Sequence, residues 1–195
     1  MFRSHASPPR TGRLSALVIH PSAVFFSAAI FLVMPAKNAL LSLLAAALHE
    51  AGHLAAALAA GMHCKKLTIY PFGADIRLAG LSSYRTDRLI ALAGPLANLL
   101  FFFCFLSLCP FFSAANLVLA ALNLLPIASL DGGSLLHALI APVFGPDTAR
   151  RTVQIFSAIT LILIWCASIY LLLYHDGDPT LFLFCAGLFS ALYLR

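Results

Sequence analysis

Two histidines and a glutamate stand close together in an otherwise apolar stretch of the chain. Glu50, the only glutamate, directly follows His49, and His53 comes three residues later. On an α-helix, residues four apart lie about 40° apart around the axis and one turn apart along it, so both imidazoles can bind one metal ion. Glu50 then lies near enough to take a proton from water bound to that metal. Together these residue types could hydrolyse an amide bond.

The spacing is that of the H-E-x-x-H helix, in which two histidines bind zinc and the glutamate acts as general base. Bound zinc lowers the pKa of its water to about 7 and polarises a carbonyl group. The alternative is a pair of helix-packing histidines that are hydrogen-bonded to their neighbours. The apolar surroundings argue against it, because an ionisable residue within a membrane span costs about 2.5–3.5 kcal/mol and requires an internal partner. We therefore expect Zn²⁺ to be that partner.

A catalytic zinc site requires three protein ligands and an open position. Apart from Glu50 the acidic residues are aspartates, and only Asp131 lies inside an apolar stretch. A continuous helix over residues 111–144 would measure about 50 Å, which exceeds a bilayer core of about 30 Å. The chain should therefore unwind after Pro126 and place Asp131 beside a polar cavity, as the third ligand. His137 fits less well, because on a helix it points about 240° away from Asp131.

The composition indicates an integral membrane protein. Apolar residues make up 62% of the chain, charged residues only 10%, and the mean hydropathy is +0.96, values far from those of soluble domains. We expect an all-α polytopic membrane protein with six transmembrane helices. The apolar stretches that could cross the bilayer are residues 14–34, 38–60, 89–108, 111–144, 152–174 and 180–194.

The positions of the basic residues predict the topology. If the N-terminus is cytoplasmic, all of the 12 lysines and arginines except Lys37 fall on the inner side of a six-span chain. Both termini are then cytoplasmic, residues 1–13 form a cytoplasmic tail, and the net charge of +5 reflects topology instead of nucleic-acid binding. The first span could be mistaken for a signal peptide, but it is longer than a usual signal and a poor cleavage site follows it. The five cysteines include no CxxC pair, so no disulfide is expected.

A short β-hairpin-like segment is predicted between the second and third helices. Residues 67–72 and 75–78 have the composition of two short strands around Gly73. Pro71 would confine its strand to an edge or a bulge. An ordinary connecting loop with some aliphatic residues is the alternative, and the pattern does not separate the two.

Two asparagines lie within predicted spans. Asn98 ends the segment Gly94-Pro95-Leu96-Ala97-Asn98, in which glycine and proline permit a kink and a close approach of helices. Both Asn98 and Asn123 could link helices through hydrogen bonds. For Asn123 an equally good interpretation is that it positions the backbone of a substrate or the segment that carries Asp131.

Three segments together resemble the site-2 protease family of intramembrane zinc metalloproteases: His49-Glu50-Ala51-Gly52-His53, the segment from Gly94 to Asn98, and the segment from Asn123 to Gly132. Within that family the chain is most similar to the bacterial sporulation stage IV type, which processes a membrane-bound pro-sigma factor. The resemblance implies that His49, His53 and Asp131 bind zinc and that Glu50 is the general base. It also implies that the strands after the catalytic helix pair with an unwound substrate, and Thr68, Ile69 and Tyr70 are the residues we expect to take part.

The expected function is that of a zinc metalloendopeptidase, a single membrane-embedded domain (1–195) in a bacterial cell membrane. It would cut a peptide bond in or next to the transmembrane segment of a membrane-bound protein such as a regulatory precursor. The lipid bilayer is a further partner, and an inhibitor protein in the same membrane is a candidate partner; nucleic acid is not expected. Sporulation-type members commonly carry a nucleotide-sensing domain after the last helix, but here the sequence stops at Arg195, so nucleotide regulation and the sigma-factor substrate are not carried over.

Other classes of function use the same residues. In a membrane metal-ion transporter the histidines and the aspartate would move an ion instead of holding it. An inactive relative would bind membrane proteins as a chaperone, and a zinc hydrolase of another kind would act on lipid amides. Tight zinc that does not exchange across vesicles would argue against transport.

Overall fold

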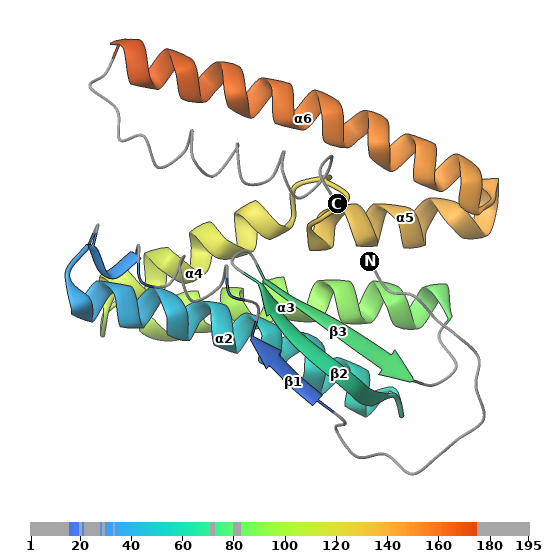
Figure 1. Ribbon diagram of the computed structural model, residues 1–195, viewed down its shortest axis with the longest axis horizontal. Coiled ribbons are helices and arrows are strands. Elements are labelled where there is room, and N and C mark those ends of the chain that lie inside the picture. Colours follow the sequence, from blue (N-terminus) through green and yellow to red (C-terminus); the bar gives the residue numbers. More distant parts are fainter. Residues whose placement is uncertain are drawn as a thin grey trace. The chain divides into compact units, whose positions relative to one another are not determined.

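The computed structural model describes residues 16–19, 21, 28, 30–32, 34–70, 73–79 and 83–174. The chain divides into two compact units, Met1–Asn123 and Leu124–Arg195, which are considered one at a time. Among the described elements, three strands and three helices belong to the first unit and two helices belong to the second (Figure 1). In chain order the elements are β1 (Ala16–Ile19), α2 (Ala36–Ala59), β2 (His63–Tyr70), β3 (Gly73–Ala79), α3 (Tyr84–Phe105), α4 (Pro110–Asn123), α5 (Asp131–Phe144) and α6 (Pro146–Tyr174).

Helices α2, α3 and α4 pack against one another in the first unit. The approach of α2 to α3 is close at Gly52, where an added Cβ would lie 2.7 Å from the carbonyl oxygen of Ala93 and 3.0 Å from the Cβ of Ala97. Small residues allow such contacts between membrane helices, whose association depends on close packing. Nearer the C-terminal end of α3, the Ser113 hydroxyl of α4 donates to the carbonyl oxygen of Phe102 over 2.8 Å.

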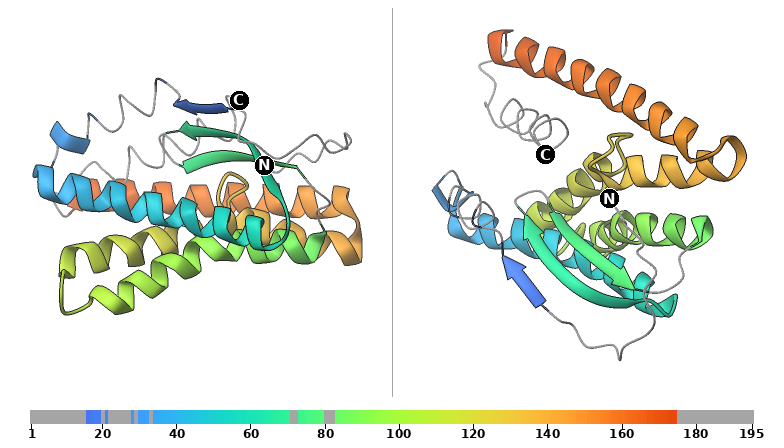
Figure 2. Two further views of the ribbon diagram at one scale, coloured as in Figure 1. Left: turned by 90° about the horizontal axis from the view of Figure 1, so that it is seen from below. Right: turned by 45° about the vertical axis from the view of Figure 1, so that its right-hand side comes forward.

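The three strands form one sheet in the order β1-β2-β3, which lies against one side of α2 (Figure 2). β3 runs antiparallel to β2, with Thr68 opposite Asp75 and Tyr70 opposite Gly73. β1 runs parallel to β2, with Ala16 opposite Lys66. The residues for which two strands were predicted thus lie in two longer paired strands, except for residues 71 and 72, which are outside the described residues.

The prediction of a helix over residues 14–34 is wrong at Ala16–Ile19, which form β1. Hydropathy cannot separate a membrane helix from a buried strand over so short a stretch, and the β-branched Val18 and Ile19 favour a strand. Pairing with β2 then decides between the two. Elsewhere in this predicted span residues 21, 28 and 30–32 are helical, as predicted, and most of the others lie outside the described residues.

In the described part of the second unit, α5 and α6 pack together and are preceded by the chain that leads into α5. Ile127, Leu130 and Leu161 form its apolar core, with Leu125 and Ile164 packed against them. Gly145 joins the two helices with a φ of 84°, a value that favours glycine.

The predicted interruption near Pro126 is confirmed, although the helix ends earlier than expected. α4 stops at Asn123 and α5 starts at Asp131, so residues 124–130 are not helical. Proline disfavours the helical conformation of the residue before it and cannot donate to a helical hydrogen bond, so the helix ends ahead of Pro126.

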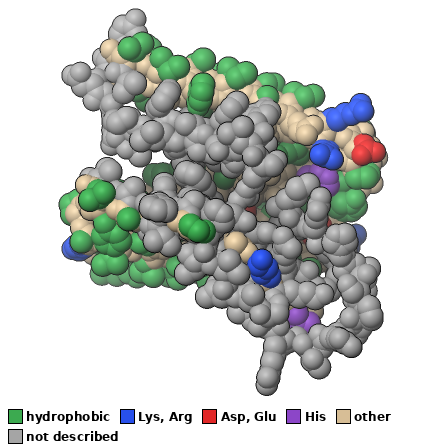
Figure 3. All heavy atoms as spheres, viewed as in Figure 1, with side chains coloured by type: hydrophobic (Ala, Val, Ile, Leu, Met, Phe, Trp, Pro, Cys, Tyr) green, Lys and Arg blue, Asp and Glu red, His purple; other side chains and the backbone are tan. Residues whose placement is uncertain are grey.

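Three helices are long and apolar enough to cross a membrane, judged by length and composition over the described residues: α2, α3 and the Pro146–Leu171 part of α6. These match three of the predicted spans. Large apolar side chains on them are exposed, as the visible face of α6 shows in Figure 3. Leu163 of α6, for example, is 64% exposed. An extended apolar surface of this kind suits lipid. Six crossings stay a prediction, because 180–194 lies outside the described residues and α4 and α5 have 14 residues each.

Candidate metal centre

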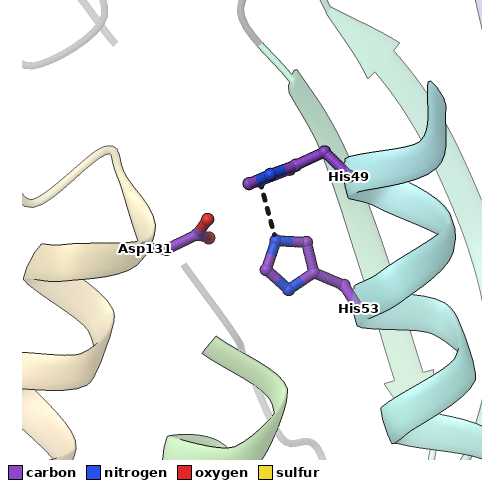
Figure 4. Close-up of side chains that lie close together, drawn as sticks. All are labelled: His49, His53 and Asp131. Atoms are coloured by element: carbon purple, nitrogen blue, oxygen red, sulfur yellow. Dashed lines mark hydrogen bonds between the residues drawn. The ribbon is translucent and has the colours of Figure 1, made fainter. Parts of the chain in front are cut away.

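His49 and His53 lie one turn apart on α2 and direct the same ring nitrogen to one point. Their Nε2 atoms are 3.1 Å apart, and the rings meet edge to face with centroids 4.7 Å apart (Figure 4). Both side chains are buried, with 4% and 5% of their surface exposed. The predicted pairing of the two imidazoles on one helix face is what α2 presents.

The ring of His53 is oriented by the backbone of α3. Its Nδ1 lies 2.7 Å from the carbonyl oxygen of Ile90. A carbonyl oxygen only accepts hydrogen bonds, so Nδ1 carries the proton and Nε2 keeps its lone pair. Metal-binding histidines are commonly fixed in this way by a bond from the second ring nitrogen. His53 is therefore in the tautomer that a metal ion requires.

Gly94 of α3 makes room for both rings. A Cβ at this position would overlap Nε2 of His53 and would lie 2.8 Å from Cε1 of His49. Pro95, which follows, is itself buried. The sequence indicated that glycine and proline here allow helices to approach each other, but it did not show that the space left by Gly94 is filled by the imidazoles.

The histidine pair fits a zinc ion. Two nitrogens bound to tetrahedral zinc at about 2.0–2.1 Å lie about 3.3 Å apart, close to the separation found between the Nε2 atoms. Imidazole nitrogen is a preferred zinc ligand, and carboxylate oxygen is another. Glu50 follows His49 on α2 and is half-buried, so it is less enclosed than either histidine.

Asp131 belongs to the second unit, where it is the first residue of α5 (Figure 4). A carboxylate in the first turn of a helix is stabilised by the helix dipole and by the free backbone N–H groups there. These groups matter more at α5 because the residue before the helix, Leu130, provides no side-chain cap. The structure thus places Asp131 at the end of a helix interruption, as the sequence predicts.

The segment before Asp131 is held by Ser157 of α6. The Ser157 hydroxyl accepts a hydrogen bond from the backbone N–H of Ala128 over 2.8 Å and donates to the carbonyl oxygen of Val153 over 2.6 Å. Ser157 is fully buried. It was missed by the sequence analysis, although a hydroxyl within an apolar span is a signal that could have indicated it.

The two glycines after Asp131 hold the same segment from the other side. A Cβ on Gly132 would overlap the carbonyl oxygens of Leu124 and Leu125, and a Cβ on Gly133 would overlap that of Ile127. The first turn of α5 therefore packs directly on the backbone of residues 124–130. This contact fixes where α5 begins and so fixes the backbone of Asp131.

The expected supporting residues lie in different settings. The Asn123 amide donates to Leu119 of its own helix over 3.0 Å, so this bond does not link two helices. Asn98 is fully buried, and neither of its amide atoms has a hydrogen-bond partner within the described part of the chain. Thr68 is buried in β2, in register with Asp75 and with Val18. Ile69 and Tyr70 follow it in β2 and are also paired.

Comparisons with known proteins identify the family of the chain. Residues 38–113 and 103–167 match Peptidase family M50. The chain is 27% identical over 180 residues to Stage IV sporulation protein FB of Bacillus subtilis (strain 168), covering 86% of this chain and 62% of that protein, so it spans less than two thirds of the relative. In structure it is similar to the Site-2 Protease from Methanocaldococcus jannaschii, with a TM-score of 0.69 and 20% identity over 88% of this chain and 86% of that one. The resemblance to site-2 proteases, and to the sporulation type among them, is thereby confirmed.

Proposed function

The chain belongs to peptidase family M50, and we propose that it is an intramembrane zinc metalloendopeptidase. It would hydrolyse a peptide bond in or next to the transmembrane segment of a membrane-bound protein. The observation that carries the proposal is the histidine pair of α2, whose two Nε2 atoms lie 3.1 Å apart in a buried setting.

We propose His49, His53 and Asp131 as the metal ligands. Each offers one ligand atom, and two imidazoles with one carboxylate leave a fourth position of a tetrahedral ion open. The proposed metal is zinc, which when bound polarises the substrate carbonyl and acidifies a water molecule. Asp131 supplies the negative charge that the two neutral imidazoles lack.

Glu50 is proposed as the general base. It lies next to His49 in the sequence and is half-buried, so it can exchange protons while the two histidines stay enclosed. Its carboxylate takes a proton from the attacking water and passes it to the nitrogen of the departing amine. Asn98 and Asn123 are proposed as supporting residues. Asn98 would support the packing of the helices around the site, and Asn123 would position the substrate backbone or the segment that carries Asp131.

The proposed setting is a bacterial cell membrane, with one domain (1–195), six spans and both termini in the cytoplasm. The three apolar helices and the M50 match support an integral membrane protein. The lipid bilayer and a membrane-bound protein substrate are the partners that follow from this setting, and an inhibitor protein in the membrane is a further candidate. A metal-ion transporter is not favoured, because the family match is to peptidases.

A substrate helix has to unwind before its backbone can be attacked. An unwound segment exposes N–H and C=O groups, and strand addition to a sheet satisfies them. We propose that β2, including Thr68, Ile69 and Tyr70, pairs with that segment. Proline at Thr68 or Ile69 should then reduce cleavage, and unchanged turnover would count against the pairing.

The test is co-expression with a tagged single-span reporter whose membrane segment contains an Asn-Pro pair, which weakens its helix. Wild type should release a fragment that is absent with Glu50→Gln, while Glu50→Gln should retain zinc by elemental analysis. His49→Ala should lose both zinc and cleavage. Cleavage by purified Glu50→Gln protein would refute the role of Glu50 as base.

A further inference from the structure

The edge of β2 that a substrate strand would need is already paired with another segment of the chain. β2 has β3 on one side and β1 on the other. The pairing with β1 covers Lys66 to Ile69, with Val18 opposite Thr68 and Ile19 opposite Ile69. Two of the three residues proposed to pair with substrate therefore have a partner strand on each side.

The two pairings of β2 differ in extent and in kind. Over the described residues, β3 is joined to β2 through seven register pairs, whereas β1 is joined through four. The β3 pairing is antiparallel and the β1 pairing is parallel, and parallel pairs are slightly less stable per residue. In the part of the sheet that the structure describes, β1 is also the shortest strand. β1 is therefore the strand that can be exchanged at the lower free-energy cost.

The regular pairing of β2 begins at a defined residue. β2 contains an irregularity between Cys64 and Lys66, and the pairing with β1 begins at Lys66. A bulge interrupts the regular ladder at that point and bends the strand. The stretch from Lys66 to Ile69 is thus the regular part of β2 that has an exchangeable partner.

The composition of β1 is that of a transmembrane segment, although its backbone is extended. It reads Ala-Leu-Val-Ile, with no polar side chain. An unwound transmembrane substrate offers the same chemistry, an extended backbone with apolar side chains. β1 and such a substrate therefore meet the same requirements at the β2 edge.

We propose that β1 is an internal competitor of the substrate: it covers the β2 edge in the resting enzyme and is displaced by an apolar segment that runs parallel to β2 opposite Lys66 to Ile69. This inference rests on the proposed function, and it fixes both the edge and the direction of the substrate strand. The opposing arrangement keeps β1 in place permanently and adds the substrate elsewhere on the sheet.

A reversible cross-link tests the exchange. In a variant whose native cysteines are replaced by serine, Ala16→Cys and Lys66→Cys place two thiols at paired positions of β1 and β2, within the reach of a disulfide. The matched control joins β2 to β3 through His63→Cys and Ala79→Cys, which are also paired. Each protein is assayed with the tagged reporter before and after oxidation, and again after reduction.

Oxidation of the β1–β2 pair should lower cleavage at least about tenfold, because the substrate then cannot take the edge, and reduction should restore it. The β2–β3 control should change less than about twofold. A locked β1–β2 protein that cuts the reporter as fast as its reduced form would overturn the inference.

A binding measurement keeps the inference separate from the proposed chemistry. With Glu50→Gln added, capture of the reporter is measured by photo-crosslinking, and the reduced β1–β2 pair should capture it while the oxidised pair should not. Equal capture in both states would overturn the competition. Failure of every reduced form to cleave, with capture still dependent on reduction, would refute the protease assignment and leave the competition standing.

Loosening β1 should have the opposite effect to locking it. Leu17→Pro and Val18→Pro alternate along the strand, and one of them removes a backbone donor that faces β2. At least one should lower KM about threefold or more without lowering kcat, since a weaker competitor leaves the edge more accessible. A loss of kcat in both, with KM unchanged, would identify β1 as a permanent part of the sheet.

Discussion

The histidine pair and the aspartate segment are held in opposite ways. His49 and His53 depend on an uninterrupted helix, whose period brings their nitrogens together, and on a glycine in the neighbouring helix that leaves space for the rings. Asp131 depends on an interruption, a non-helical segment kept in place by Ser157 and by two glycines. Regular structure can thus place ligands by spacing alone, whereas an irregular segment needs contacts from outside itself.

The largest effect is expected from filling the space beside the histidines. Gly94→Leu adds a side chain where a Cβ alone would overlap His53, so both rings must move. We expect loss of bound zinc and a fall in cleavage of about 1000-fold or more. Elemental analysis and the reporter assay measure the two. Leu96→Ala is the matched control, because Leu96 lies on the same helix with 56% of its surface exposed, and it should retain zinc and activity.

A smaller effect is expected when the first turn of α5 is pushed away from the segment before it. Gly133→Ala would bring a methyl group against the carbonyl of Ile127, and we expect a fall in cleavage of about 10- to 100-fold. Val143→Ala serves as control, because Val143 is an exposed residue of the same helix. Wild-type cleavage by the Gly133→Ala protein would show that the position of Asp131 tolerates a change in this packing.

Ser157→Ala should weaken the support of the segment before Asp131, at a greater distance from the proposed metal than the two glycines. It removes the acceptor for the Ala128 N–H and leaves that donor buried, at a cost of about 1–3 kcal/mol. We expect weaker zinc binding and about tenfold slower cleavage. Ser157→Thr should restore both, because it keeps the hydroxyl.

The control for Ser157 lies on the same helix. The Thr152 hydroxyl donates to the carbonyl of Thr148 in the same way that Ser157 donates to Val153. It is on an exposed face, however, and within the described residues it holds no other segment. Thr152→Ala should therefore behave as wild type. If both alanine variants lost activity equally, the loss would belong to helix α6 and not to the segment before Asp131.

The sheet provides the smallest expected effect. Burial raises the pKa of the Cys64 thiol in β2, and a hydrogen bond with the backbone of Lys66 lowers it in part. The thiolate is the reactive form, so at a given pH Cys64 should be alkylated more slowly than free cysteine, and its pH profile should lie at higher pH. Mass spectrometry after timed iodoacetamide labelling measures this. Labelling as fast as free cysteine at neutral pH would contradict the burial of the thiol.

The sequence indicated the parts of the site that depend on local spacing. His49 and His53 could be paired because the helical period is fixed, and the interruption before Asp131 could be predicted because a helix over 111–144 is too long for a bilayer. Three apolar helices could be predicted because each requires only an apolar stretch long enough to cross a bilayer.

Contacts between distant segments could not be read in this way. The partners of Gly94 and Ser157 depend on how helices pack, and a sequence without its fold does not specify which atoms fill the space beside a glycine. The prediction of a helix at Ala16–Ile19 was wrong for a related reason. The strand forms because it pairs with the edge of β2, and the hydropathy of a segment does not reveal which segment it will pair with.

The bond from His53 to the carbonyl of Ile90 has a consequence for anyone who dissects this protein by mutagenesis. The acceptor is a main-chain atom, so every amino acid at position 90 supplies it, and a scan of side chains would report the position as indifferent to polarity. The tautomer of a proposed zinc ligand is thus encoded in the path of a neighbouring helix. The importance of this hydrogen bond would become visible only if the backbone of α3 were altered, for example by a substitution of Pro95 that changes the course of the helix.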